Sequence, residues 1–557
     1  MNFAHFKFLV LFNALKNNLQ SNLTEVVYTD KGPVQGEFRT TVQNKIKYSA
    51  FRGIRYGKPP VGYARFKPPE EADPWRKVFN ATSEATPCPQ RDIINKVYVG
   101  DEDCLNLNVY TPKTNFKKTN DKLLPVMVWL HGGGFYSGWT NISFFGPDFL
   151  IEEKVVVVAV NYRLGALGFL ALNHTNATGN AGLKDQLLAL KWVNKNIKKF
   201  GGDPNLVTLF GHSAGGVSVD YHILSKASKG LFHRSISMSG SHYCQWAYSR
   251  PKEAESQAFN LAFFLHLNIT DRNKDELLTS LYKIPPQDIV EATRNLHNID
   301  LPFKPTLEDP LVAGDSAFYS QCSDDIYKSG NFSHVPHMTG FMKDEALTIG
   351  PGDSMLMIKK TLNEGDRVIK NSSNFLSFPW KNFYAYMVTQ GASLLLTSVS
   401  EAAFIKDIDA KQQIMTQYST APVYFYGISF TSTISIHERI HHINMKGAAH
   451  EDELAYFWYV SLLEYPEDPK NPFIIMKNRI TRMWTNFAKY GNPTPDGESD
   501  PLLGIKWTEA KVDGKFLDIN EDLTMKKNSI SAASQLFSYA IHGFGTNYQC
   551  SNSQNSS

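Results

Sequence analysis

Short apolar runs alternate with helix-like stretches along this chain, and this alternation limits the folds open to it. Val155–Val160 (VVVVAV) is an unbroken β-branched run, as expected of a parallel strand that is covered on both faces. Ala181–Phe200 has apolar residues at helical spacing and ends at two glycines. A repeated strand–helix order predicts an α/β fold with a mainly parallel sheet. Further strands are predicted at 125–130, 205–210, 234–239, 335–341 and 421–429.

Charge and composition exclude several classes of protein. The 57 Lys and Arg against 54 Asp and Glu give a net charge of +3, with no basic block, so a dedicated nucleic-acid binder is excluded. A hydrophobic content of 42% excludes bulk disorder. Five cysteines without a C-x-x-C pair indicate neither a disulfide-dense scaffold nor a zinc site. Because no repeat or linker divides the 557 residues, we predict one large domain over 21–545.

The two ends and the glycosylation motifs bear on location. Residues 1–20 hold one early Lys and a short apolar core (FLVLFNAL), which indicates a signal peptide, with an ordinary core segment as the alternative. No apolar stretch reaches eighteen residues, so no membrane anchor is expected, and 546–557 is predicted to be a polar tail. A secreted, extracellular protein is therefore predicted. Nine N-x-S/T motifs support secretion modestly, at Asn22, Asn80, Asn141, Asn173, Asn176, Asn268, Asn331, Asn371 and Asn555.

A nucleophile motif follows the strand predicted at 205–210. Gly211–Gly215 (GHSAG) fits G-x-S-x-G and stands between a strand and a helix, the context that this motif requires. A sharp turn there would lift the Ser213 hydroxyl above the sheet edge. The amide groups that begin the next helix would favour developing negative charge. We predict that Ser213 is a nucleophile; the alternative is a glycine-rich turn without chemistry.

A glycine run follows the strand predicted at 125–130. Glycine lets backbone N–H groups approach a substrate without a Cβ in the way. We predict that the N–H groups of Gly133, Gly134 and Ala214 form an oxyanion hole for an attacked carbonyl. The alternative is a turn that binds nothing, and His131 at its entrance is expected to be structural.

Taken together, these motifs resemble the type-B carboxylesterase/cholinesterase family of α/β-hydrolases, and most of all the insect carboxylesterases. The resemblance covers nearly the whole mature chain and implies the α/β-hydrolase fold, with a large central, mainly parallel mixed β-sheet flanked by helices. It rests on the ordered blocks FRGIRYGKPPVGYARFKPP (51–69), EDCLNLNVYTP (102–112), WLHGGGF (129–135), NYRLGALGFL (161–170), NAGLKDQ (180–186) and FGHSAGG (210–216).

The resemblance implies a Ser-Glu-His triad. The family acid stands in a G-x-x-x-D-E block and matches Glu345, and the family base stands in G-x-x-H-x-x-D/E and matches His450. The order Ser213, Glu345, His450 is that of the α/β-hydrolases. The residues alone leave Asp344 open as the acid.

Three other histidines compete as the base. His437, His441 and His442 lie in a polar stretch (HERIHH), and we interpret them as surface or loop residues. The implied chemistry needs neither metal nor organic cofactor. Its reactants are a small hydrophobic ester and water, which pass through an acyl-enzyme.

Further site residues follow from the same resemblance. Ser239 matches a serine that hydrogen-bonds the triad acid, and Trp246 matches a tryptophan of the acyl pocket. His212 is predicted to line the substrate pocket. For each of the three the alternative is plain packing or a backbone hydrogen bond.

The resemblance also implies one disulfide and one ion pair. Cys88 and Cys104 match the family's first disulfide, and Arg65 and Glu102 match a buried salt bridge beside it. An exposed, weak pair is the alternative for the latter. Cys244 matches a free position, and the states of Cys322 and Cys550 stay open.

The substrate is predicted to be a general carboxylic ester rather than a choline ester. The loop between Cys88 and Cys104 contains no Trp for cation–π binding, and His212 stands where cholinesterases carry Glu. A juvenile-hormone-esterase-like enzyme is one alternative, although that motif usually has Gln before the serine. A non-catalytic, neuroligin-like binding protein is the other.

Overall fold

A computed structural model describes residues 22–118, 120–296, 301–348, 391, 394, 396–497 and 500–527. Its centre is a sheet of 13 strands in the order β1-β2-β3-β7-β9-β8-β12-β13-β14-β15-β16-β17, with β4 paired to β2. The strands of this sheet are β1 (Leu23–Tyr28), β2 (Pro33–Thr40), β3 (Lys47–Arg55), β4 (Phe79–Asn80), β7 (Asn106–Thr111), β8 (Leu124–Leu130), β9 (Val156–Val160), β12 (Gly202–His212), β13 (Arg234–Met238), β14 (His337–Met342), β15 (Val423–Ile428), β16 (Lys515–Ile519) and β17 (Thr524–Lys527).

The middle of the sheet is parallel and its two ends are antiparallel. The strands from β9 through β8 and β12 to β16 pair in parallel. The outer pairs along the order, from β1 to β9 and between β16 and β17, are antiparallel. The α/β-hydrolase prediction of a large, mainly parallel mixed sheet is confirmed. Two small sheets pair β5 (Gln90–Arg91) with β6 (Tyr98–Val99) and β10 (Ala171–His174) with β11 (Ala177–Thr178).

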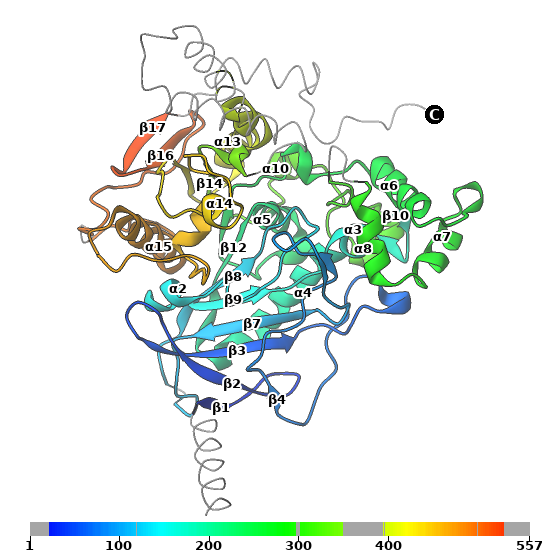
Figure 1. Ribbon diagram of the computed structural model, residues 1–557, viewed down its shortest axis with the longest axis horizontal. Coiled ribbons are helices and arrows are strands. Elements are labelled where there is room, and N and C mark those ends of the chain that lie inside the picture. Colours follow the sequence, from blue (N-terminus) through cyan, green and yellow to red (C-terminus); the bar gives the residue numbers. More distant parts are fainter. Residues whose placement is uncertain are drawn as a thin grey trace, which may run out of the picture.

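Helices cover both faces of the sheet (Figure 1). A lobe of α6, α7 and α8 stands at one side, and α15 lies at the other. The α-helices are α2 (Asp148–Glu152), α3 (Gly165–Phe169), α4 (Ala181–Asn196), α5 (Ala214–Leu224), α6 (Pro251–Phe264), α7 (Lys274–Leu281), α8 (Pro286–Arg294), α9 (Pro310–Ala313), α10 (Ser323–Ser329), α13 (Lys406–Tyr418), α14 (Ile436–Arg439) and α15 (Pro472–Tyr490). Short 3-10 or π turns are η1 (Gly62–Ala64), η2 (Ile197–Phe200), η3 (Lys226–Ser228), η4 (Gln245–Ala247), η5 (Thr270–Arg272), η6 (Gly314–Ser316), η7 (Glu345–Leu347), η8 (Glu401–Ile405) and η9 (Asp452–Tyr456).

The alternation of side chains along a strand divides the core into two layers. Val128 of β8 packs in a cluster that includes Val217 of α5, whereas its neighbour Trp129 packs in a second cluster with Trp484 of α15. All four side chains are fully buried. Strands β8 and β9 are therefore covered on both faces, which is why they are unbroken apolar runs in the sequence.

All the strands predicted from apolar runs are present, with bounds that differ by a few residues. The largest difference is in β12, predicted at 205–210, which extends over Gly202–His212. The helix predicted at 181–200 consists of α4 and the short turn η2. The strands β1, β2, β3 and β7 and the pair β16–β17 were not among the predictions, because polar residues interrupt each of them and none is an unbroken apolar run.

The predictions about the two ends fall on residues outside the described ranges. The signal peptide at 1–20, the tail at 546–557, Asn371, Asn555 and Cys550 are not described. Within the described ranges, no helix is both long and apolar enough to cross a bilayer. The other seven glycosylation motifs all have an exposed or half-exposed asparagine.

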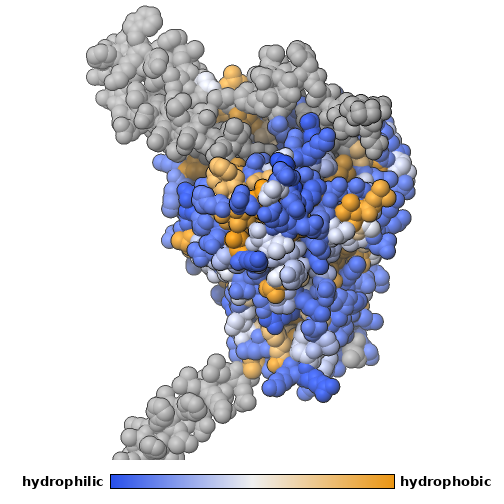
Figure 2. Space-filling model, turned by 90° about the vertical axis from the view of Figure 1, so that its right-hand side faces the viewer, coloured by the Kyte–Doolittle hydropathy of each residue, from blue (hydrophilic) through white to orange (hydrophobic). Residues whose placement is uncertain are grey.

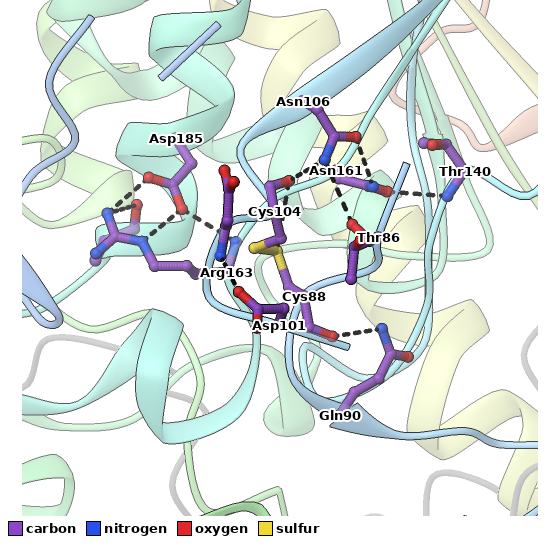
Figure 3. The surroundings of a disulfide bond; sticks show 12 residues. Thr86, Cys88, Gln90, Asp101, Cys104, Asn106, Thr140, Asn161, Arg163 and Asp185 are labelled. Atoms are coloured by element: carbon purple, nitrogen blue, oxygen red, sulfur yellow. Dashed lines mark hydrogen bonds and ion pairs between the residues drawn. A yellow bond between two sulfur atoms is a disulfide. The ribbon is translucent and has the colours of Figure 1, made fainter. Parts of the chain in front are cut away.

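The predicted disulfide joins Cys88 to Cys104 at the edge of the hydrophobic core, and polar side chains hydrogen-bond to the backbone of both cysteines (Figure 3). Gln90 Nε2 donates to the carbonyl oxygen of Cys88 at 3.1 Å, and Asn106 Nδ2 donates to that of Cys104 at 2.9 Å. The prediction of this bond is confirmed. Cys244 is free and buried, as the match implied, and Cys322 is disulfide-bonded.

The ion pair beside this disulfide is buried and bidentate. Arg65 Nε and Nη2 donate to the two carboxylate oxygens of Glu102 at 2.7 and 2.8 Å. The same guanidinium donates at 2.7 Å to the carbonyl oxygens of Leu281 and Ile284 at the end of α7. Since the side chains are only 6% and 11% exposed, this is the buried pair, and the exposed alternative is wrong.

We expect Glu102→Gln to lower the free energy of unfolding by about 3–5 kcal/mol, because it leaves a buried guanidinium without its counter-charge. Urea unfolding at pH 7 measures this. Glu70→Gln is the matched control, since Glu70 contacts Lys58 with 70% of its side chain exposed and should change stability little. Equal effects of the two substitutions would contradict the assignment.

Candidate active site

Ser213 occupies a strained turn between β12 and α5, at the carboxyl end of a central strand. Its φ of 56° and ψ of −124° are unfavourable for a residue with a Cβ. Its N–H donates to the carbonyl oxygen of Met238 at 2.8 Å, which ties the turn to the end of β13. A Cβ on Gly215 would lie 2.0 Å from the carbonyl oxygen of Leu130. The second glycine of the motif is therefore required by the close approach of β8.

Glu345 and His450 form a fully buried pair. Glu345 Oε2 lies 2.5 Å from His450 Nδ1, and neither side chain has any exposed surface. Glu345 Oε1 accepts from the N–H of Met342 at 2.9 Å. The carboxylate of Asp344, the alternative acid, instead accepts from the N–H of Ala448 at 3.0 Å. Of the two acids, Glu345 is the one that holds the imidazole.

The other imidazole nitrogen, His450 Nε2, is buried and makes no hydrogen bond to any described residue. The Ser213 hydroxyl therefore does not hydrogen-bond to it here, and such bonds are frequently long in ligand-free sites and tighten when substrate binds. Burial and the neighbouring His212 lower the pKa of His450. The imidazole is thus neutral at pH 7 and has a nitrogen free to accept a proton.

The electrostatics of Glu345 are set by burial and by a second carboxylate. Burial first, and then the charge of Glu453, raise the pKa of Glu345. The hydrogen bond from Met342 opposes that rise. A carboxyl with its pKa raised in this way needs nearby positive charge or donors to stay ionised at neutral pH.

The loop that carries His450 is held by another buried carboxylate. Asp452 Oδ2 lies 2.6 Å from His437 Nδ1 and accepts from the N–H of Ala449 at 3.0 Å. Its Oδ1 accepts from the N–H of His437 at 3.0 Å. The prediction that His437 is a surface or loop residue is wrong, because this pairing buries it. His441 is half-buried against Glu451.

The glycine loop lies directly against the nucleophile turn. A Cβ on Gly132 would lie 2.8 Å from the carbonyl oxygen of His212 and 3.1 Å from Ser213 Cβ. Gly133 and Gly134 both have positive φ, of 105° and 59°. The N–H groups of these two glycines and of Ala214 donate to no backbone carbonyl of the described chain. Three amide donors thus stand near Ser213 without a backbone partner.

Gln90 fixes the far side of this loop. Its Oε1 accepts from the N–H of Gly138 at 2.6 Å and from the hydroxyl of Ser137 at 3.1 Å. Since Gln90 follows Cys88 by two residues, the disulfide loop and the glycine loop are joined through one side chain. His131 is buried and stacks on Tyr162 at 4.4 Å, which agrees with the expected structural role.

Ser239 lies beside the candidate acid but hydrogen-bonds a different carboxylate. Its hydroxyl donates to Glu453 Oε1 at 2.8 Å, whereas the sequence match predicted Glu345 as its partner. The hydroxyl lies between the two carboxylates and also opposes the rise in the pKa of Glu345. Having one proton, it makes its short hydrogen bond to only one of them.

The two predicted pocket residues lie on either side of His450. The imidazole rings of His212 and His450 are 4.4 Å apart, and His212 is only 1% exposed. Trp246 is half-buried, its ring lies 5.5 Å from that of Phe404, and the Phe404 ring lies 5.1 Å from that of His450. Trp246 is therefore two rings from the candidate base, and His212 is in contact with it.

Sequence reasoning missed Glu453, Asp452 and Gln90. The first two stand in the very block that gave His450, where the D/E position is part of the pattern, so that position was a usable signal. No sequence pattern pointed to Gln90. Within the described residues, no group of three His, Cys, Asp or Glu side chains is arranged to hold a metal ion.

Comparison with known proteins identifies the family. A family model described as "Carboxylesterase family" matches residues 23–537. The chain belongs to the carboxylesterase family. As a member it is a carboxylic-ester hydrolase of the α/β-hydrolase fold.

Individual relatives of this carboxylesterase are similar over most of their length. A juvenile hormone esterase of Tribolium castaneum is 34% identical over 89% of this chain and 88% of its own. A pyrethroid hydrolase, Ces2a, of Mus musculus is 34% identical over 87% of both. The crystal structure of the juvenile hormone esterase of Manduca sexta, with OTFP covalently attached, superposes with a TM-score of 0.77 at 28% identity, covering 93% of this chain and 98% of that one.

We expect Gly133→Ala to lower kcat for ester hydrolysis roughly 100–1000-fold, because its Cβ would lie 2.1 Å from the carbonyl oxygen of Ser137 and displace the amide donors. Gly230→Ala is the control, since Gly230 also has positive φ but has open space around its Cβ position. Steady-state kinetics measure kcat of both variants, and circular dichroism checks that both are folded. If the two lose the same activity, backbone strain and not the donor position is responsible.

Proposed function

We propose that this carboxylesterase is a secreted serine hydrolase that uses Ser213, Glu345 and His450 as its triad. The observation that carries the proposal is the 2.5 Å contact between Glu345 and the buried His450, beside a nucleophile turn with positive φ. The amides of Gly133, Gly134 and Ala214 are proposed as the oxyanion hole.

The mechanism follows from these positions. His450 Nε2 accepts the proton of the Ser213 hydroxyl as its oxygen attacks the ester carbonyl. Glu345 keeps the proton of His450 on Nδ1 and stabilises the imidazolium that forms. The imidazolium then protonates the leaving alcohol, which leaves an acyl-enzyme. Water attacks that ester by the same steps and releases the acid.

The substrate is proposed to be a small hydrophobic ester. A cavity of about 320 Å³ lies beside the glycine loop and is bounded by Tyr136. Its other walls are mainly apolar, with Leu164, Leu167 and Ile289, but also include Arg91 and Arg294, and none of the described lining residues is a carboxylate. Apolar walls favour an alkyl or terpenoid group. They supply no negative charge to attract a choline cation.

A juvenile-hormone-esterase-like activity is the second candidate. It is favoured by the 34% identity to the juvenile hormone esterase of Tribolium castaneum and by the superposition on that of Manduca sexta. His212, in place of the Gln usual in that motif, weighs against it. A non-catalytic binding protein is disfavoured because all three triad side chains are present and Glu345 contacts His450.

Secretion is supported by three observations. A signal peptide is predicted at 1–20, the structural disulfide joins Cys88 to Cys104, and none of the described glycosylation asparagines is buried. A venom carboxylesterase of Apis mellifera, 31% identical over 89% of this chain, is among the relatives.

We expect Ser213→Ala to lower kcat by roughly six orders of magnitude while the protein stays folded, because the attacking oxygen is removed. Hydrolysis of naphthyl acetate and covalent labelling by an organophosphate measure this. Ser461→Ala, at an exposed serine, is the control and should label and turn over as the wild type does. A wild type without turnover and without labelling would support the binding-protein alternative.

A panel of esters tests the substrate class. We expect kcat/KM to be higher for naphthyl and methyl terpenoid esters than for acetylcholine by at least about tenfold, because the described lining of the cavity carries two arginines and no carboxylate, and so repels rather than binds the choline cation. A preference for the methyl terpenoid ester over simple alkyl esters would select the second candidate. A preference for acetylcholine would refute the assignment of class.

A further inference from the structure

A second imidazole–carboxylate pair lies next to that of Glu345 and His450. His212 Nε2 is 3.3 Å from Glu453 Oε1, and the two side chains are only 2% and 1% exposed. The pair comes from distant parts of the chain, since His212 ends β12 and Glu453 lies in η9. Neither residue has a part in the proton transfers described above.

The pair contacts His450 and acts electrostatically on Glu345. The His212 ring is 4.4 Å from the His450 ring, and Glu453 acts electrostatically on Glu345. Ser239 donates to Glu453 and lies close to Glu345 as well. The other groups that face this cluster are Glu451, from the loop of His450, its partner His441, and the buried phenol of Tyr426, from β15.

We infer that His212 and Glu453 form a buried ion pair that sets the charge around the catalytic dyad, with His212 as a positioning residue that acts through His450 and Glu345. The inference rests on the proposed triad. It assigns to the residue before the nucleophile an electrostatic task, in place of the substrate-lining role predicted from sequence.

The direction of the pKa shifts agrees with the geometry. Burial alone would lower the pKa of His212, but the charge of Glu453 raises it. Burial alone would raise the pKa of Glu453, but the charge of His212 lowers it. Each group thus favours the charged form of the other, as a buried pair must do if neither is to be left uncompensated.

The charges of Glu453 and His212 change the pKa values of Glu345 and His450. The Glu453 carboxylate destabilises a second negative charge on Glu345, and the His212 cation offsets it. The His212 cation also repels a proton on His450, which keeps that imidazole neutral. Removal of His212 alone therefore leaves Glu453 uncompensated and raises the pKa of His450, whereas removal of both charges nearly cancels.

The test is a set of pH profiles of kcat/KM for naphthyl acetate, which report the pKa values of the free enzyme. We expect the acidic limb of His212→Gln to move to higher pH by at least about one unit. The double variant His212→Gln/Glu453→Gln should return it toward the wild-type position. A purely structural role would lower activity without moving the limb.

His222→Gln is the matched control. His222, in α5, is also a fully buried histidine, and it lies between Ser228 and Gln186. Burial lowers its pKa to about 3, so this imidazole is neutral. Its removal should leave the limb unchanged. A His212→Gln limb that coincides with that of His222→Gln, or a double variant that fails to restore it, overturns the inference.

Two further measurements keep the outcome unambiguous. Organophosphate labelling of Ser213 in the wild type tests the triad separately. A wild type that is not labelled refutes the proposed function. A labelled wild type, with an acidic limb that does not move in His212→Gln, refutes only the ion pair. If His212→Gln does not fold, 15N-histidine spectra at pH 7.5 replace it. The wild type should show one imidazolium more than Glu453→Gln, and equal spectra overturn the inference.

Discussion

The contact between Glu345 and His450 is the interaction on which the rest of the site depends, because it places a charged group where there is no water to solvate it. A carboxylate with no exposed surface is stable only if donors and cations surround it. Met342 supplies an amide donor, and the Ser239 hydroxyl lies close by. The arrangement of β13, β14 and the His450 loop is thus constrained by the need to satisfy one buried acid.

Other buried polar side chains around the site also need hydrogen-bond partners. Asp452 gathers the side chain and N–H of His437 and the N–H of Ala449, and so holds the loop that carries the candidate base. Gln90 holds the glycine loop through Ser137 and Gly138. Buried polar side chains, each satisfied by backbone groups of another segment, fix catalytic loops that have little regular structure of their own.

Much of the fold and of the candidate site could be predicted from the sequence. The parallel strands β8 and β9 are unbroken apolar runs because both faces of the sheet are covered, and the strained serine turn is predicted from the two glycines in G-x-S-x-G. Three features could not be read in this way. The antiparallel edge strands lack unbroken apolar runs, His437 looked polar and exposed in a charged stretch, and the hydrogen bond of Ser239 went to Glu453. Each depends on which distant segment lies opposite, which local pattern does not encode.

The sequence by itself determined the fold class, the family and the motifs that contain the three candidate catalytic side chains, because periodicity and short motifs are local properties. Only the tertiary structure decided between Asp344 and Glu345 as the partner of the imidazole, and only it brought His212 within 3.3 Å of Glu453. The physical reason is that a hydrogen bond or close ion pair forms only when the two groups lie within about 3–4 Å of each other, and the tertiary fold sets that separation. Two acids that are adjacent in the chain can therefore contact different partners, and two residues that are 241 positions apart can form one ion pair.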